Sequence, residues 1–109
     1  MARLWDAAIP ARATVDTFET IGLRLGPTTR DDFVRLYMAP GGYHCRNGRG
    51  PSNFDALSAL EAWSERGTRP DAIVASGGGM TRPLCPYPQR ARLIDPNGST
   101  TNASNFRCQ

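Results

Sequence analysis

A short apolar run that ends in a glycine-rich turn is the feature that most constrains the fold of this sequence. Residues 33–38 alternate in polarity and are rich in β-branched and aromatic side chains, which predicts a strand. Pro40, Gly41 and Gly42 end the run, so His44 is expected on a loop at the carboxyl end of that strand. Open α/β sheets place their working side chains at this edge. The stretch favours an α/β fold with His44 as a candidate functional residue, although a single histidine in a turn also suits a purely structural role.

A first amphipathic helix is predicted before this strand. Apolar side chains recur at helical spacing over residues 11–25, at Val15, Phe18, Ile21 and Leu25. The pair at residues 26–27, Gly then Pro, is expected to end the helix. Residues 28–32 are rich in hydroxyl and carboxylate side chains, which predicts a cap and a short turn.

A second amphipathic helix is predicted after the histidine loop. Residues 46–51 are expected to form a loop, and Ser52 and Asp55 have the spacing of a capping box. The apolar face of the helix is predicted at Phe54, Leu57, Leu60 and Trp63, and Gly67 and Pro70 are expected to close it.

The remainder of the chain has little periodicity. Residues 72–75 are predicted to form a short strand, residues 76–79 a flexible link, and residues 82–88 an extended segment. Trp63, Phe54 and Phe18 are expected in the core.

Neither the charge pattern nor the hydropathy favours a nucleic-acid-binding protein or a membrane protein. The net charge is +3, and all 13 basic residues are arginines scattered from Arg3 to Arg107 without a run. A nucleic-acid surface would gather them on one face. Nothing approaches the roughly 18 consecutive apolar residues of a membrane-spanning helix, and the first residues have no apolar core of a signal peptide.

The three cysteines suggest a disulfide more than a metal site. Cys45, Cys85 and Cys108 lack CxxC spacing, and the sequence has a single histidine as a further possible ligand, so a structural zinc site is not expected. Cys85 and Cys108 flank a polar, turn-rich tail with little core of its own, where an oxidised chain uses a disulfide. Cys45 is then left over; a redox-active role for it is disfavoured, because a reactive thiol usually has an electropositive setting and a resolving cysteine.

Several blocks in order along the chain resemble the C-terminal end of the tannase and feruloyl esterase family. They are Gly41-Gly42-Tyr43-His44-Cys45, Gly50-Pro51, Phe54-Asp55-Ala56-Leu57, Ala62-Trp63-Ser64-Glu65-Arg66-Gly67 with Pro70-Asp71, Thr81-Arg82-Pro83-Leu84-Cys85-Pro86-Tyr87-Pro88, and Asn105-Phe106-Arg107-Cys108. Together these blocks cover nearly the whole chain.

The resemblance implies an α/β-hydrolase serine esterase with a Ser, Asp, His triad in that order. Carried over by motif, the catalytic histidine is His44, and Cys45 is a half-cystine whose partner, beside the nucleophilic serine, lies outside this chain. The family's acid sits in a pattern like Asp-x-x-Ile-Pro, which Asp6 fits. Cys85 and Cys108 match C-terminal cysteines that such proteins pair with each other.

The family's nucleophile turn, oxyanion-hole segment and lid insertion are absent from this sequence. Residues 1–109 are therefore expected to be the C-terminal portion of an α/β-hydrolase catalytic domain, with two helices, two or three strands and a disulfide-tied extended tail. No cofactor is expected in this chain; calcium, which some members bind, would belong to the absent lid.

These features predict an esterase for aromatic acid esters such as gallate or ferulate, inactive as this chain alone. The expected partners are a small aromatic ester and the missing N-terminal portion of the fold, with no nucleic acid and no membrane, and the expected location of the full-length protein is secreted or periplasmic. The alternative is a binding or interaction module that kept this part of the fold and lost catalysis. Such a module would need a partner for its open faces.

Overall fold

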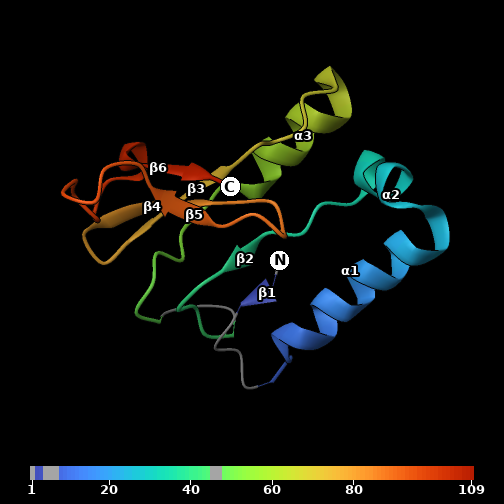
Figure 1. Cartoon of the computed structure of the whole chain (residues 1–109), viewed down its shortest axis with the longest axis horizontal. Coiled ribbons are helices and arrows are strands. Elements are labelled where there is room, and N and C mark those ends of the chain that lie inside the picture. The colour runs from blue at the N-terminus through green and yellow to red at the C-terminus, as the bar shows by residue number, and fades with distance from the viewer. Residues whose placement is uncertain (1, 4–7, 45–47) are drawn as a thin grey trace.

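The computed structural model describes residues 2–3, 8–44 and 48–109 (Figure 1). Within them lie three α-helices, six short strands and one turn of 3₁₀-helix. The elements run β1 (Ala2–Arg3), α1 (Ala11–Leu25), α2 (Pro27–Phe33), β2 (Met38–Ala39), α3 (Ala56–Arg66), β3 (Ile73–Gly77), β4 (Met80–Leu84), β5 (Ala91–Leu93), the 3₁₀ turn (Ala103–Asn105) and β6 (Phe106–Cys108). No helix in the described residues is long and apolar enough to cross a membrane.

Helix α1 has the predicted bounds. The N–H of Gly26 donates to the carbonyl of Gly22 at 2.9 Å, and this bond ends the helix where the sequence changes to glycine and proline. Phe18 is its buried anchor, with the guanidinium of Arg30 stacked 3.9 Å from the ring centre. Leu25, in contrast, is exposed, so the buried stripe is narrower than the periodicity predicts.

The segment between α1 and β2 differs from the prediction. Residues 27–33 form helix α2 in place of a cap and short turn, because Pro27 suits the first position of a helix and the following polar residues do not break it. The predicted strand 33–38 is reduced to Met38–Ala39, since Phe33 belongs to α2 and the N–H of Val34 still bonds to the carbonyl of Arg30 at 2.8 Å.

Helix α3 is confirmed, with a different cap and a different burial pattern. The carboxylate of Asp55, not the hydroxyl of Ser52, accepts the free N–H of Ser58 at 2.9 Å. Gly67 ends the helix in the left-handed conformation, as predicted. The predicted apolar face is largely open: Leu57 is 66% exposed and Leu60 58% exposed.

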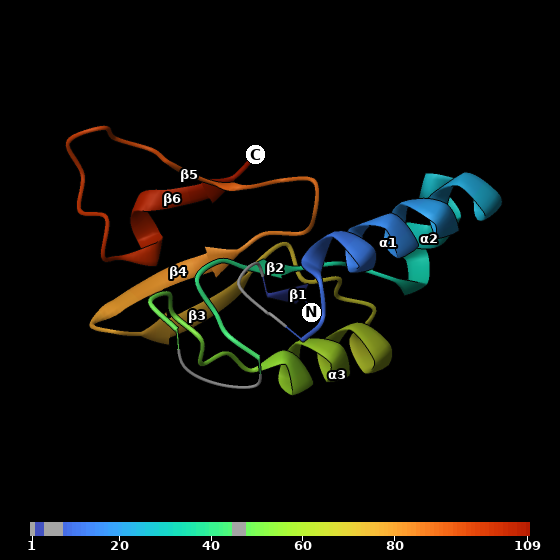
Figure 2. The ribbon, with the colours of Figure 1, turned by 90° about the horizontal axis from the view of Figure 1, so that it is seen from below.

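The C-terminal half forms two antiparallel hairpins. The strand predicted at residues 72–75 is confirmed as β3, whereas the flexible link predicted at residues 76–79 is the end of β3 and a tight turn into β4. Strands β3 and β4 pair from Ile73 with Leu84 to Gly77 with Met80. The connecting residues, Gly78 and Gly79, both have positive φ, as a two-residue hairpin turn requires. Strands β5 and β6 form the second hairpin, which lies beside the first in Figure 2.

Two small apolar clusters hold the chain together. The larger one joins β2 to the first hairpin and contains Tyr37, Ala39, Ile73, Ala75 and Leu84. The smaller one places Phe18 of α1 against Leu36, just before β2. Of the three aromatic residues predicted in the core, Phe18 is fully buried, and Phe54 and Trp63 are half-buried. The short segment that leads to the histidine is therefore packed from both sides.

Candidate functional site

The candidate site is organised by a parallel pair of very short strands. Ala2 pairs with Met38 and Arg3 with Ala39, so β1 and β2 point the same way and end at the same edge (Figure 1). In sequence, His44 follows β2 by five residues and Asp6 follows β1 by three. This is the edge at which open parallel sheets carry functional side chains.

His44 lies exposed in the loop that follows β2. The chain turns at residues 40–41, and Gly42 then forms an antiparallel bridge with Gly48 across the base of the loop. A second backbone bond, from the N–H of Gly50 to the carbonyl of Gly41 at 3.1 Å, closes the loop further. The histidine is thus presented on a loop with a fixed base, at the position that the sequence predicts.

Two other predicted site residues, Asp6 and Cys45, lie outside the described residues. The roles assigned to them remain predictions. No group of three or more histidine, cysteine, aspartate or glutamate side chains in the described part of the chain could hold a metal ion.

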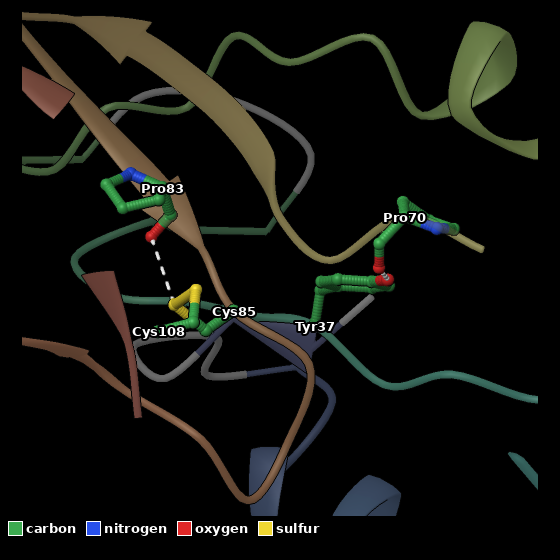
Figure 3. Close-up of a disulfide and its surroundings, with 5 residues drawn as sticks. All are labelled: Tyr37, Pro70, Pro83, Cys85 and Cys108. Carbon is green, nitrogen blue, oxygen red and sulfur yellow. Dashed lines mark hydrogen bonds between the residues drawn. A yellow bond between two sulfur atoms is a disulfide. The ribbon is translucent and has the colours of Figure 1, made fainter. Parts of the chain in front are cut away.

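Tyr37 anchors the strand that leads to His44, a role for which no motif in the sequence provides a signal. Its hydroxyl donates to the carbonyl of Pro70, far along the chain, as Figure 3 shows. Burial raises the pKa of Tyr37, so the phenol stays protonated and able to donate. Beside it, Leu36 accepts a bond from the N–H of Tyr87 at 2.7 Å. The segment after β4 therefore holds β2 in place.

The predicted disulfide between Cys85 and Cys108 is confirmed (Figure 3). Its Cα atoms are 5.5 Å apart, and it ties the end of β6 to the residue that follows β4. Because the same segment bonds to Leu36 and bridges Tyr37 through Pro86, the disulfide stabilises the support of β2.

A cavity of about 420 Å³ opens on the hairpin side of the molecule, between the first hairpin and β6. It is lined by Asp71, Ala72, Pro83, Gln89, Phe106, Arg107 and Cys108. His44 is not among these residues, so this cavity is separate from the candidate site.

The chain matches the family model described as tannase and feruloyl esterase over residues 2–109. It is 41% identical over 94% of its length to a mono(2-hydroxyethyl) terephthalate hydrolase from Piscinibacter sakaiensis, and 30% identical over 96% of its length to a probable feruloyl esterase from Arthroderma benhamiae. It covers 18% and 21% of those proteins, respectively, so it spans about a fifth of their length.

The crystal structure of feruloyl esterase B from Aspergillus oryzae superposes on 98% of the chain with a TM-score of 0.82 at 26% identity, and the match covers 25% of that structure. A second esterase from the same organism superposes with a TM-score of 0.83 at 24% identity. The chain has the fold of the corresponding part of these α/β-hydrolase-type proteins. The chain belongs to the tannase and feruloyl esterase family.

Proposed function

We propose that this chain is the C-terminal portion of a carboxylic ester hydrolase and carries the acid and the base of a Ser, Asp, His triad. The observation that carries the proposal is the parallel pairing of β1 with β2, because both strands end at the same edge and Asp6 and His44 are the residues that follow them in sequence, by three and five positions. Membership of an esterase family supports the same assignment. The substrate class is an ester of an aromatic acid, in line with the names of the relatives.

In the proposed mechanism, His44 removes the proton from a serine hydroxyl as its oxygen attacks the ester carbonyl. The resulting tetrahedral intermediate collapses to an acyl-enzyme, and His44 returns the proton to the leaving alcohol. Water then repeats the sequence, with His44 again as base, and releases the acid. Asp6 accepts a hydrogen bond from the Nδ1–H of His44, which fixes the tautomer of the imidazole and stabilises the imidazolium.

The serine, the oxyanion hole and the lid belong to a portion of the fold that precedes these residues. Exposed leucines support such a missing neighbour. Apolar surface faces water at Leu57 and Leu60 on α3 and at Leu23 on α1, and Leu23 is 87% exposed. A two-residue parallel pair is also far shorter than a stable sheet and normally has further strands beside it. Cys45 would pair with the cysteine beside the serine and hold nucleophile and base together.

A chimeric protein tests the proposal. This chain replaces the segment that it matches in the Piscinibacter hydrolase, and turnover of mono(2-hydroxyethyl) terephthalate is measured. We expect turnover in the chimera, and a loss of about ten-thousandfold in kcat for both His44→Ala and Asp6→Asn. Asp16→Asn is the matched control, because Asp16 is an exposed carboxylate of α1 that pairs with Arg12; it should leave kcat unchanged.

The chain alone should show no turnover of an aryl ester that depends on His44. If the isolated chain hydrolyses the aryl ester and His44→Ala abolishes this hydrolysis, the nucleophile cannot belong to another segment. A chimera whose turnover is insensitive to His44→Ala would reject the proposed function itself.

A further inference from the structure

Four glycines bring two stretches of backbone into direct contact at the base of the histidine loop. The bridge between Gly42 and Gly48 and the 3.1 Å bond from Gly50 N–H to Gly41 carbonyl lie side by side. We call this arrangement the glycine clasp: residues 41 and 42 on one side, and residues 48 and 50 on the other.

The close approach leaves no room for a side chain. A Cβ atom added to Gly50 would lie 2.1 Å from the carbonyl oxygen of Pro40, and one added to Gly48 would lie 2.0 Å from that of Gly41. A Cβ on Gly41 would lie 2.8 Å from the Gly50 nitrogen. Real Cβ atoms do not come so near to backbone atoms, so any larger residue must push the two sides apart.

The clasp is anchored on both sides. One side continues directly from β2, whose Ala39 is fully buried. On the other side, Asn53 exchanges two backbone bonds with Ser76 of β3, of 3.0 and 2.8 Å. Pro51, between the clasp and this bridge, is buried. The base of the loop is therefore fixed to two separate elements of the core.

We propose that the glycine clasp is a positioning device for His44, with Gly41 and Gly50 as its positioning residues. This inference rests on the proposed function, in which His44 must reach a serine on another segment. A loop open at its base would let the imidazole move by an ångström or more, and a displacement of that size costs about a hundredfold in rate. The clasp removes this freedom without contributing an atom to the chemistry.

Gly41→Ala and Gly79→Ala form a matched pair for the test. Their φ angles are 71° and 73°, so alanine meets a positive φ of nearly the same size at both positions. Only Gly41 has a neighbour in the way, because an added Cβ at Gly79 meets nothing within 4 Å. In the active chimera we expect Gly41→Ala to lower kcat by about a hundredfold with KM within about twofold, and Gly79→Ala to change neither.

Gly50→Ala, with the closer approach, should lower kcat further than Gly41→Ala. Amide exchange monitors the clasp independently of activity: the Gly50 amide should be protected in the parent protein and lose protection in Gly41→Ala. The β3 and β4 amides should stay protected in every variant, which shows that the rest of the fold is intact.

Each outcome decides the proposal. Lost protection with unchanged kcat would overturn it, as would equal losses of kcat in Gly41→Ala and Gly79→Ala. If Gly50→Ala fails to fold, the comparison of Gly41→Ala with Gly79→Ala decides the question alone. A chimera whose turnover does not depend on His44 would reject the proposed function and this inference with it, and the His44→Ala control identifies that case.

Discussion

Removing the disulfide should loosen the second hairpin and the segment that supports β2. Cys85 and Cys108 are 23 residues apart, and closing a loop of that length removes conformational entropy from the unfolded chain worth about 3 kcal/mol at 25 °C. Small domains have total stabilities of about 5 to 15 kcal/mol, so the expected loss is a large share. We therefore predict that Cys85→Ala/Cys108→Ala is severely destabilised in this region.

Hydrogen exchange measures this loss where it should occur. Two amides at either end of the second hairpin are suitable probes: Arg90 donates to the carbonyl of Gln109 and Ile94 to that of Asn105, both at 2.8 Å. Since each 1.4 kcal/mol corresponds to a factor of ten, protection should fall about a hundredfold. The amide of Gly26, at the end of α1, should change much less.

Cys45→Ala is the control, because it removes a thiol and leaves the disulfide in place. A thiol titration of the isolated 109-residue chain under denaturing conditions should find one free thiol, and the same titration of the Cys45→Ala chain should find none. If the double variant loses less than threefold in protection at Arg90 and Ile94, the entropic reasoning is wrong, and the hairpin is held by its own contacts.

Two further predictions concern the support of β2 and the cap of α3. Tyr37→Phe removes the donor to the Pro70 carbonyl inside a buried contact, so the free energy of unfolding should fall by about 1 to 2 kcal/mol, as measured by urea denaturation; an unchanged midpoint would mean that water replaces the bond. The hydrogen bonds from the Ser58 side chain and backbone hold the pKa of Asp55 below its usual value, so the cap stabilises the helix above the unfolded-state pKa and loses this effect as pH falls through the folded-state pKa. Circular dichroism should show α3 losing helicity at acid pH in the parent but no such pH dependence in Asp55→Asn, and identical profiles would contradict the assignment.

Helices α1 and α3 are predictable from sequence because their ends carry local signals. Gly26 and Gly67 stop α1 and α3 where backbone geometry demands it, and Phe18 marks the buried side of α1. Helix α2 was missed because its seven residues are mostly polar and provide no apolar period to recognise. Pro27 stands at its start, and Arg30 stacks over Phe18 of α1, a contact between helices.

The strands were less predictable because their partners are distant or their signals are weak. Residues 76–79, a serine and three glycines, predict a flexible link, although the two positive φ angles at Gly78 and Gly79 are what a tight hairpin needs. Leu57 and Leu60 have a helical spacing that predicts burial, yet nothing in the described residues covers them. The periodicity of apolar residues identifies the apolar face of a helix, but it does not identify what packs against that face.

A motif in the sequence predicts the position of His44, but no motif predicts the contacts that hold the neighbouring backbone in place. His44 follows an apolar run and a glycine turn, which can be read along the chain. The bond of Tyr37 to Pro70 and the approach of Gly50 to Gly41 join residues from separate stretches. Such contacts depend on the folded arrangement and leave no pattern in a single sequence.

The pairing of β1 with β2 also has a consequence for the order of folding. The two hairpins join strands that are close neighbours in sequence, so their loops close at small entropic cost. Strand β1 reaches β2 only after a connection that contains both α1 and α2, which makes this the contact of longest sequence separation among the strand pairs. Contacts of high separation form late and slow the overall rate. We therefore expect the edge that would carry the chemistry to form after the two hairpins.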